Sequence, residues 1–290
     1  MEELSLSDFD RAFPHQPIAY TSGEFNGLNA SKAESVKALA LREDGGELVA
    51  GQIFGLRGGE WLAPFSAPFS CLAGSPIYNN VYYAEARTAL GGPIRLVLPP
   101  KIYGAARAPH NAEVLYEDAN YHYPLEQFVD YEAHLSRAGK YNHHRALKHN
   151  FDFFKTDDVA RAYGVIAENR RAMGYPLAMS LKQVEETIKI IPADFFVMQL
   201  EGKDVAAAMI YQAAPGIMQV IYWGDLPEGR YARSMNRLAW EVFGWYSRNR
   251  PEISIIDIGP ASSEGVLNDG LVQFKESIGC VRSSKLTVKI

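Results

Sequence analysis

A basic stretch is the first feature of this chain whose residue types and spacing suit chemistry. Lys140, Arg145 and Lys148 lie along one segment of a chain whose net charge is −5. Ammonium and guanidinium groups bind phosphate through charge-assisted hydrogen bonds, so the stretch could hold a phosphate of a nucleotide-linked or tRNA substrate. The charged face of an ordinary helix would carry the same residues, and both interpretations stay open.

One acidic residue stands where a general base could act. Asp257 follows Ile255 and Ile256 at the predicted end of a strand. If burial raised its pKa, the carboxylate could take a proton from an attacking amine. A cap or turn role ahead of Gly259 and Pro260 is the simpler alternative.

The motifs of several common enzyme classes are absent. The chain has no G-x-S-x-G, H-E-x-x-H or G-x-x-x-x-G-K-[ST] segment, so serine hydrolase, zincin and P-loop chemistry have no sequence support. His143 and His144 are adjacent and would point apart on a helix, so we assign no metal. Cys71 and Cys280 suit small core residues better than a disulfide framework.

The composition indicates a globular protein. Hydrophobic residues make up 47% of the 290 residues and charged residues 22%, which suffices for a buried core. The negative net charge argues against a general nucleic-acid binder but leaves room for a local basic site. No apolar run reaches the roughly 20 residues that span a bilayer, and the polar N-terminus lacks a secretion signal. We therefore expect a cytoplasmic protein without a membrane span.

The C-terminal part reads as an ordered series of elements. Three apolar runs separated by short turns predict an antiparallel meander over residues 193–200, 205–211 and 217–223. Two helices are expected before it, and a helix, a strand, a helix and a strand after it. These six elements are expected at 159–173, 180–190, 230–248, 253–258, 271–278 and from 281 onward.

The N-terminal part repeats this order in a shorter form. A second meander is expected, then a helix with Asn80 as its N-cap, then a buried strand. These elements are expected at 35–41, 48–56, 61–65, 81–90 and 94–98. We place a domain boundary near residue 125, which divides the chain into residues 1–125 and 126–290. No flexible linker separates the two parts, so we expect them to pack together.

Four short segments carry a resemblance. Residues 169–177 read N-R-x-x-x-G-x-P-L, and residues 270–279 read G-L-x-x-F-K-x-x-x-G. An R-x-x-K pair begins at Arg145, and a turn rich in small residues and proline covers 66–74. Together with the element order, these segments resemble the GNAT N-acyltransferase superfamily. The tandem arrangement resembles its FemAB-like branch, the peptidyltransferases that use aminoacyl-tRNA and their relatives.

The resemblance implies a fold and several site residues. It implies an α+β fold with three layers of the α/β type, made of two tandem GNAT-like domains. Each domain would hold a mixed, mainly antiparallel sheet flanked by helices, with the first domain truncated. Lys275 and Arg170 would contact a phosphate or the donor, although solvated helix residues would look the same. Tyr222 and Trp223 end the fourth strand of the second domain, where GNAT folds bulge toward the acyl donor, although core aromatics are the alternative.

One segment departs from the superfamily. GNAT enzymes that use acetyl-CoA carry a Q/R-x-x-G-x-G/A loop that holds the pyrophosphate at a helix N-terminus. Residues 224–234 occupy this place with different glycine spacing. Arg230 and Arg233 could bind a cofactor phosphate, but Asp225 and Glu228 would repel a pyrophosphate. Acetyl-CoA is therefore a weaker expectation than another acyl donor.

These observations lead to one preferred function. We expect an N-acyltransferase that transfers an acyl or aminoacyl group to an amine-bearing small molecule or peptide, in a cleft between the fourth and fifth strands of the second domain. No tightly bound cofactor is expected, and the donor is left open between aminoacyl-tRNA and acyl-CoA. Two alternatives remain: an acetyl-CoA-dependent GNAT enzyme with a degenerate loop, and a non-catalytic binding module.

Overall fold

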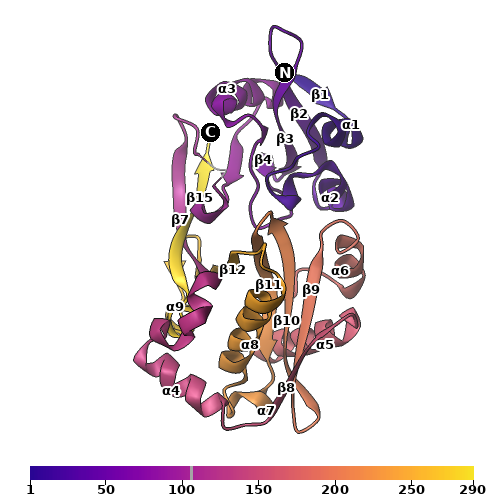
Figure 1. Ribbon diagram of the computed structural model, residues 1–290. Coiled ribbons are helices and arrows are strands. Elements are labelled where there is room, and N and C mark those ends of the chain that lie inside the picture. The colour runs from indigo at the N-terminus through magenta and orange to yellow at the C-terminus, as the bar shows by residue number, and fades with distance from the viewer. Residues whose placement is uncertain (105–106) are drawn as a thin grey trace.

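One continuous sheet runs along the molecule in the computed structural model, which describes residues 1–104 and 107–290. Within these residues the sheet has 13 strands, and their order is β1-β2-β3-β4-β6-β15-β7-β12-β11-β10-β9-β8 with β5 attached to β3. Helices cover both faces of its lower part (Figure 1). The expected α+β fold with a mixed, mainly antiparallel sheet is confirmed.

The element bounds are as follows. The strands are β1 Glu2–Leu4, β2 Ser35–Arg42, β3 Leu48–Arg57, β4 Glu60–Ala63, β5 Ala73–Gly74, β6 Ile94–Val97, β7 Glu113–Pro124, β8 Phe151–Thr156, β9 Ala193–Leu200, β10 Lys203–Ala214, β11 Ile217–Asp225, β12 Ile255–Pro260, β13 Ser262–Ser263, β14 Val266–Leu267 and β15 Val281–Lys289. The α-helices are α1 Leu6–Ala12, α2 Gly23–Leu28, α3 Asn79–Leu90, α4 Arg137–Ala146, α5 Val159–Met173, α6 Leu181–Thr187, α7 Pro227–Arg230, α8 Ser234–Asn249 and α9 Asp269–Ser277.

Both predicted meanders are present. Strands β2, β3 and β4 pair antiparallel, as do β9, β10 and β11, and each meander is followed by a helix and a parallel strand. The helix expected from residue 180 begins with Ser180 as its N-cap, which forms a full capping box with Gln183 and so satisfies two backbone donors. The expected N-cap at Asn80 is wrong, because α3 begins at Asn79 and Tyr78 precedes it without a side-chain cap.

Strands β7 and β15 join the two parts of the chain. Strand β7 lies between β12 and β15, and the end of β15 also pairs with β6. The two long strands stand side by side at the left of Figure 1. The sheet therefore continues across the boundary placed at residue 125, and the division into residues 1–125 and 126–290 stays a prediction.

Two apolar clusters fill the opposite faces of the sheet around β9 to β12. One cluster packs under α8 and includes Val220 and Ile258, with Trp223, Met235 and Phe274 against it. The other packs under α5 and α6 and includes Tyr20 from the N-terminal part and Tyr211, with Ile221 and Tyr222 against it. Alternate strand residues point to opposite faces, so Val220 and Ile221 of β11 serve different clusters.

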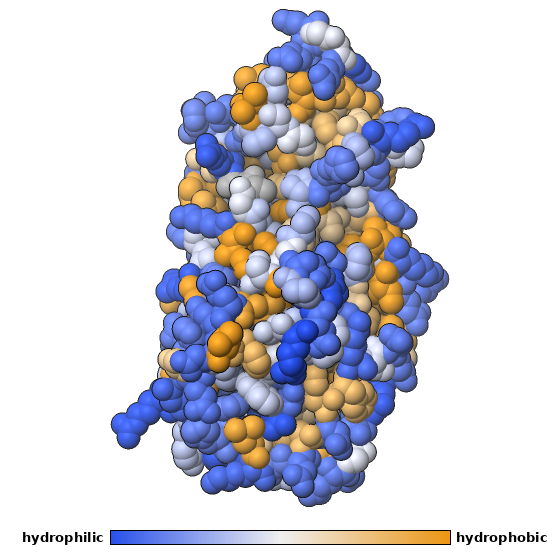
Figure 2. All heavy atoms as spheres, in the orientation of Figure 1, coloured by the Kyte–Doolittle hydropathy of each residue, from blue (hydrophilic) through white to orange (hydrophobic). Residues whose placement is uncertain are grey.

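The face of the molecule seen in Figure 2 is largely hydrophilic. Charged and polar residues cover much of the face in Figure 2, and apolar residues form separate patches on it. Among the described residues, no helix is long and apolar enough to cross a bilayer.

Candidate functional site

The fourth and fifth strands of the second meander part from each other. Strands β11 and β12 pair only over Ile217–Gln219 and Ile255–Asp257. Beyond that point β11 continues to Asp225 beside β10, while Gly259 and Pro260 of β12 keep only the pairing with β7 that the whole strand makes. The expected opening between these two strands is therefore present. Its edges carry backbone groups that have no partner across the gap.

A cavity of about 1400 Å³ occupies this opening. Its lining comes from both faces of the sheet, because Tyr222 belongs to the α5 side and Trp223 to the α8 side. It is also lined by both parts of the chain, since Lys32 and Arg57 reach it from the N-terminal part. The cavity thus passes between β11 and β12 and has a lobe on each face. Such a large cleft with a few polar groups is typical of a ligand site.

The two lobes differ in chemistry. The α5-side lobe is lined by Lys32, Arg57, Arg170, Tyr175, Met179, Tyr211, Gln219 and Tyr222. The α8-side lobe is lined by Val220, Trp223, Met235, Ile258, Leu271, Phe274 and Lys275. Cations and hydroxyls therefore gather in the first lobe, while the second is apolar apart from one lysine.

A bulge in β11 places the aromatic residues. The register with β10 shifts between Met209 and Ile210, which leaves Ile221 without a partner between Val220 and Tyr222. A bulge redirects the side chains that follow it. Tyr222 accordingly turns to the α5 side, where its hydroxyl accepts a hydrogen bond from the Ala178 backbone N–H at 3.3 Å. The bulge expected at the end of the fourth strand is present.

Asn169 holds the end of β11 against α5. Its Nδ2 donates to the Asp225 carbonyl oxygen at 2.6 Å. Gly224 makes this approach possible, because a Cβ there would lie 2.5 Å from Asn169 Oδ1. The first residue of the N-R motif therefore positions a cavity wall, a role that the sequence analysis did not assign.

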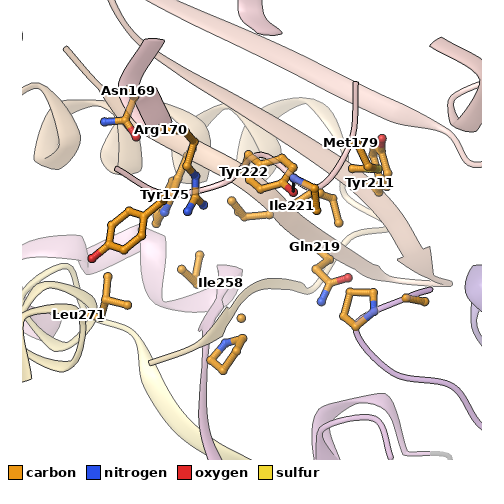
Figure 3. A pocket seen from close by; sticks show the side chains of 18 of the residues that line it. Asn169, Arg170, Tyr175, Met179, Tyr211, Gln219, Ile221, Tyr222, Ile258 and Leu271 are labelled. Atoms are coloured by element: carbon orange, nitrogen blue, oxygen red, sulfur yellow. Dashed lines mark hydrogen bonds between the residues drawn. The ribbon is translucent and has the colours of Figure 1, made fainter. Parts of the chain in front are cut away.

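Arg170 is the most available cation of the α5-side lobe. Its guanidinium lies over the Tyr222 ring at 5.1 Å and near the Tyr175 ring at 6.0 Å, and Figure 3 shows the three side chains close together. Its Nε is buried and has no hydrogen-bond partner among the described residues. A guanidinium that is stacked on aromatic rings and has no acidic partner among the described residues is suited to a carboxylate or phosphate.

Two further cations come from the N-terminal part of the chain. Lys32 Nζ donates to Asn29 Oδ1 at 2.8 Å and to Ser66 Oγ at 3.0 Å. Partial burial, and then the charge of Arg57, lower the pKa of Lys32. The Arg57 guanidinium donates to the Phe65 carbonyl oxygen at 3.1 Å. No motif of the sequence pointed to either residue, because only the packing of the two parts brings them to the cavity.

Lys275 lies in the wall of the α8-side lobe and is 97% buried. Its Nζ donates to the carbonyl oxygens of Ile258, Gly259 and Pro260 at 3.2, 2.8 and 2.8 Å. These three bonds use every donor of the ammonium group. Burial lowers the pKa of Lys275 to about 8. The lysine therefore ties α9 to the end of β12 and adds positive charge beside the cavity.

Asp257 has a different place from the one expected. It lies within β12 with no exposed surface, and it does not line the cavity. Its carboxylate accepts hydrogen bonds from Asn120 Nδ2, Gly259 N–H, the Tyr103 hydroxyl and Gln219 Nε2, at 2.8, 3.0, 2.9 and 3.0 Å. A carboxylate with four donors is already satisfied. The geometry favours a positioning role over the general-base role predicted from the sequence.

The remaining predicted residues are spread around the cavity. Arg230 lines it, but its Nε donates to Asp225 Oδ1 at 3.1 Å. Arg233 precedes α8 in a left-handed conformation with φ of 60° and does not line the cavity. Arg145 lies on α4 outside the cavity, and its Nη2 donates to the Tyr231 carbonyl oxygen at 3.3 Å. The structure therefore brings Arg170, Tyr222, Trp223, Arg230 and Lys275 together at the cavity.

An acidic side chain lies at the start of α8, in the loop that the resemblance compares with a pyrophosphate loop. Asp225 Oδ2 accepts a hydrogen bond from Ser234 Oγ, at the first residue of α8, at 2.8 Å. A carboxylate close to the start of a helix satisfies the positive end of the helix dipole. Asp225 therefore occupies the place of an anion in the loop where the sequence already departed from the GNAT pattern.

Comparisons with known proteins bear on the fold. The chain aligns with FemX over 100% of its length and 97% of that chain, with a TM-score of 0.65 and 12% identity. The chain has the tandem GNAT-like fold of FemX. L-PGS from Bacillus licheniformis aligns with 98% of this chain and 90% of its own at a TM-score of 0.59 and 13% identity. A tandem GNAT protein from the clavulanic acid biosynthesis pathway aligns over 99% of this chain and 94% of its own. The TM-score is 0.54 and the identity is 11%. No family model and no curated protein sequence matches.

Proposed function

We propose that this protein is an N-acyltransferase of the FemAB-like kind, which moves an acyl or aminoacyl group from an activated ester or thioester to an amine. One observation carries the proposal: the cavity passes between β11 and β12 and is walled by both faces of the sheet. A donor on one face and an acceptor on the other would meet at the gap. Holding two reactants in this way supplies much of the rate enhancement of such reactions.

The positive charges of the α5-side lobe make it the better place for the acceptor. Lys32, Arg57 and Arg170 line this lobe, so an acceptor that also carries a carboxylate or phosphate would be held there. The same positive charges disfavour an ammonium group and lower its pKa. The acceptor amine would therefore enter as the free base, which removes the need for a dedicated carboxylate base.

The reaction itself needs few groups. The amine nitrogen attacks the carbonyl carbon, and the carbonyl oxygen takes up negative charge. The C–O or C–S bond of the donor then breaks, and the leaving alcohol or thiol takes the proton that the nitrogen loses. Backbone N–H groups on the open edge of β11 beyond Gln219 would stabilise the oxyanion. Lys275 adds a positive charge on the opposite wall. A catalytic triad is not required.

Two observations bear on the identity of the acyl donor. Asp225 stands at the start of α8, where acetyl-CoA would need to place its pyrophosphate, and this disfavours CoA. Aminoacyl-tRNA is the donor implied by the FemAB-like resemblance. Another similar structure, at a TM-score of 0.64 and 12% identity, is the C-terminal DUF2156 domain of an Agrobacterium fabrum protein assigned as a lysylphosphatidylglycerol synthetase, a name that implies aminoacyl transfer.

The experiment compares the two donors directly. The protein is incubated with tRNA charged with a mixture of radiolabelled amino acids, or with radiolabelled acetyl-CoA, and with a panel of anionic amines. We expect label in an amide product from aminoacyl-tRNA. The variant Arg170→Met should lose most of this transfer, because the cation that orients the acceptor is gone. Arg171→Met is the matched control, since the Arg171 side chain is 75% exposed and pairs with Glu168.

Each outcome has a clear meaning. Transfer from aminoacyl-tRNA that Arg170→Met removes and Arg171→Met retains supports the proposal. Transfer from acetyl-CoA alone assigns the donor instead to CoA. Absence of transfer from both donors, with a folded protein whose Tm rises on adding the same amines, would show a binding module.

A further inference from the structure

The α8-side lobe has walls that suit an apolar group. Trp223, Met235, Ile258 and Phe274 contribute side chains to it, and Trp223 meets Phe274 edge to face at 5.9 Å. Leu271 lies on the opposite side of the opening from Tyr222 (Figure 3). Burying an apolar side chain against such walls is favourable in proportion to the area removed from water.

Charged groups find no free partner in this part of the cavity. Among the described residues that line the cavity, Asp225 is the only carboxylate. Its two oxygens accept hydrogen bonds from Arg230 and Ser234. Lys275 is the cation of the α8-side lobe, and its three donors are used by backbone carbonyls. A buried cation without a partner is costly, and the positive charge of Lys275 repels it further, so this lobe excludes cationic side chains.

Building on the proposed function, we propose that the α8-side lobe is the acyl compartment and selects an apolar acyl or aminoacyl group. Cationic aminoacyl groups such as lysyl are rejected there. The compartment lies across the β11–β12 gap from Arg170, so the acyl chain and the anionic end of the acceptor occupy opposite faces of the sheet. Met235, at the second residue of α8, is the residue best placed to set this preference.

The test uses probes that differ only in side-chain charge. Nα-acetyl-norleucine methyl ester and Nα-acetyl-lysine methyl ester have the same chain, but the lysine probe ends in an ammonium group. Their binding to the full chain is measured by isothermal titration calorimetry. Norleucine is expected to bind about tenfold or more tightly than lysine, the effect of leaving one charge unpaired.

A variant that introduces a negative charge tests whether the α8-side lobe sets the preference for an apolar group. Met235→Glu places a carboxylate in the first turn of α8, where an acidic residue is compatible with the helix. This variant should bind the lysine probe more tightly than norleucine. Met179→Glu puts the same group in the α5-side lobe and should leave the norleucine preference unchanged. Circular dichroism and Tm confirm that both variants are folded.

The outcomes separate this inference from the proposed function. Equal binding of the two probes, tighter binding of lysine, or no saturable binding of norleucine overturns the apolar compartment. A reversal by Met179→Glu in place of Met235→Glu overturns its location. Efficient transfer of lysyl groups would contradict the apolar compartment and support the proposed acyl transfer. Selective binding of norleucine without any transfer would support the apolar compartment and contradict the proposed acyl transfer.

Discussion

Gln219 and Asp257 form the last paired rung between β11 and β12, and Gln219 Nε2 donates to Asp257 Oδ2 at 3.0 Å. The cavity begins directly beyond this rung. The Tyr20 hydroxyl donates to Gln219 Oε1 at 2.6 Å, which ties the N-terminal part of the chain to the same point. The rung therefore fixes where the strands separate and how the two parts of the chain meet there.

The first prediction concerns Asp257. All four of its neighbours are donors, so the substitution Asp257→Asn would turn an amide NH₂ toward two of them. We expect the free energy of unfolding in urea to fall by about 2 kcal/mol, because buried donors lose their acceptor. The exposed Asp157→Asn should change it by less than about 0.5 kcal/mol.

One result would instead support the general-base role that the sequence predicted for Asp257. If Asp257→Asn unfolded at the wild-type urea concentration but lost acyl transfer, the carboxylate would act as the general base after all. If Asp257 has a positioning role, the variant will be less stable, and its remaining transfer activity will be proportional to the fraction of protein that is folded.

The second prediction tests the contact between β11 and α5. Gly224→Ala would place a Cβ 2.5 Å from Asn169 Oδ1 and push the side chain off the Asp225 carbonyl. We expect a loss of about 1–3 kcal/mol in thermal or urea unfolding. Gly164→Ala, in the middle of α5 with no atom within 4 Å of its added Cβ, should stabilise the protein instead. An unchanged Tm for Gly224→Ala would show that Asn169 moves freely.

The third prediction is a pH dependence that comes from Lys275. Burial lowers its pKa to about 8 in the folded protein, whereas an unfolded lysine titrates near 10.4. Between these values the unfolded chain binds more protons, so stability rises with pH. The maximum slope is about 1.4 kcal/mol per pH unit, and the gain between pH 8 and 9.5 is about 1.6 kcal/mol, because the slope at pH 8 is half the maximum.

The measurement compares wild type with Lys275→Met. The difference in unfolding free energy between the two proteins should grow in favour of the wild type as the pH rises from 8 to 9.5. A parallel pair of stability curves would show that the lysine keeps its ordinary pKa. Lys182→Met serves as the control, because the Lys182 side chain is 83% exposed and should give no such difference.

Much of the fold could be predicted from the sequence because its meanders are regular. The runs 193–200 and 217–223 are apolar and end at turn residues, and β9 and β11 lie there. By contrast, β7 was not predicted. Its Asp118, Asn120 and His122 are typical of a loop, but the structure gives two of them buried partners from distant segments.

The site was predictable only in part, for a related reason. Arg170 and Lys275 belong to local motifs, Tyr222 lies at the end of a predicted strand, and all three line the cavity. Lys32 and Arg57 come from the N-terminal part and become site residues only through packing. Asp257 was predicted to act as a base at the end of its strand, yet it is buried, with β7 paired to β12 beside it.

The last prediction uses the basic stretch on α4 to identify the donor. Lys140 and Lys148 are exposed and lie outside the cavity, while Arg145 contacts the Tyr231 carbonyl beside α7 and α8. A tRNA whose acyl end enters the cavity would extend over this surface. The double variant that combines Lys140→Ala and Lys148→Ala should therefore have a higher KM for aminoacyl-tRNA than the wild type. Its KM for the amine should not change.

Salt dependence makes the same test quantitative. Each lysine that contacts a phosphate contributes about one unit to the slope of log affinity against log salt. The double variant should therefore show a slope shallower by about two units, with the same Tm as the wild type. Exposed Lys182→Ala and Lys189→Ala on the other side of the sheet form a control pair with equal loss of charge. If both pairs change the slope equally, the effect comes from net charge, and the α4 stretch has no specific role in binding tRNA.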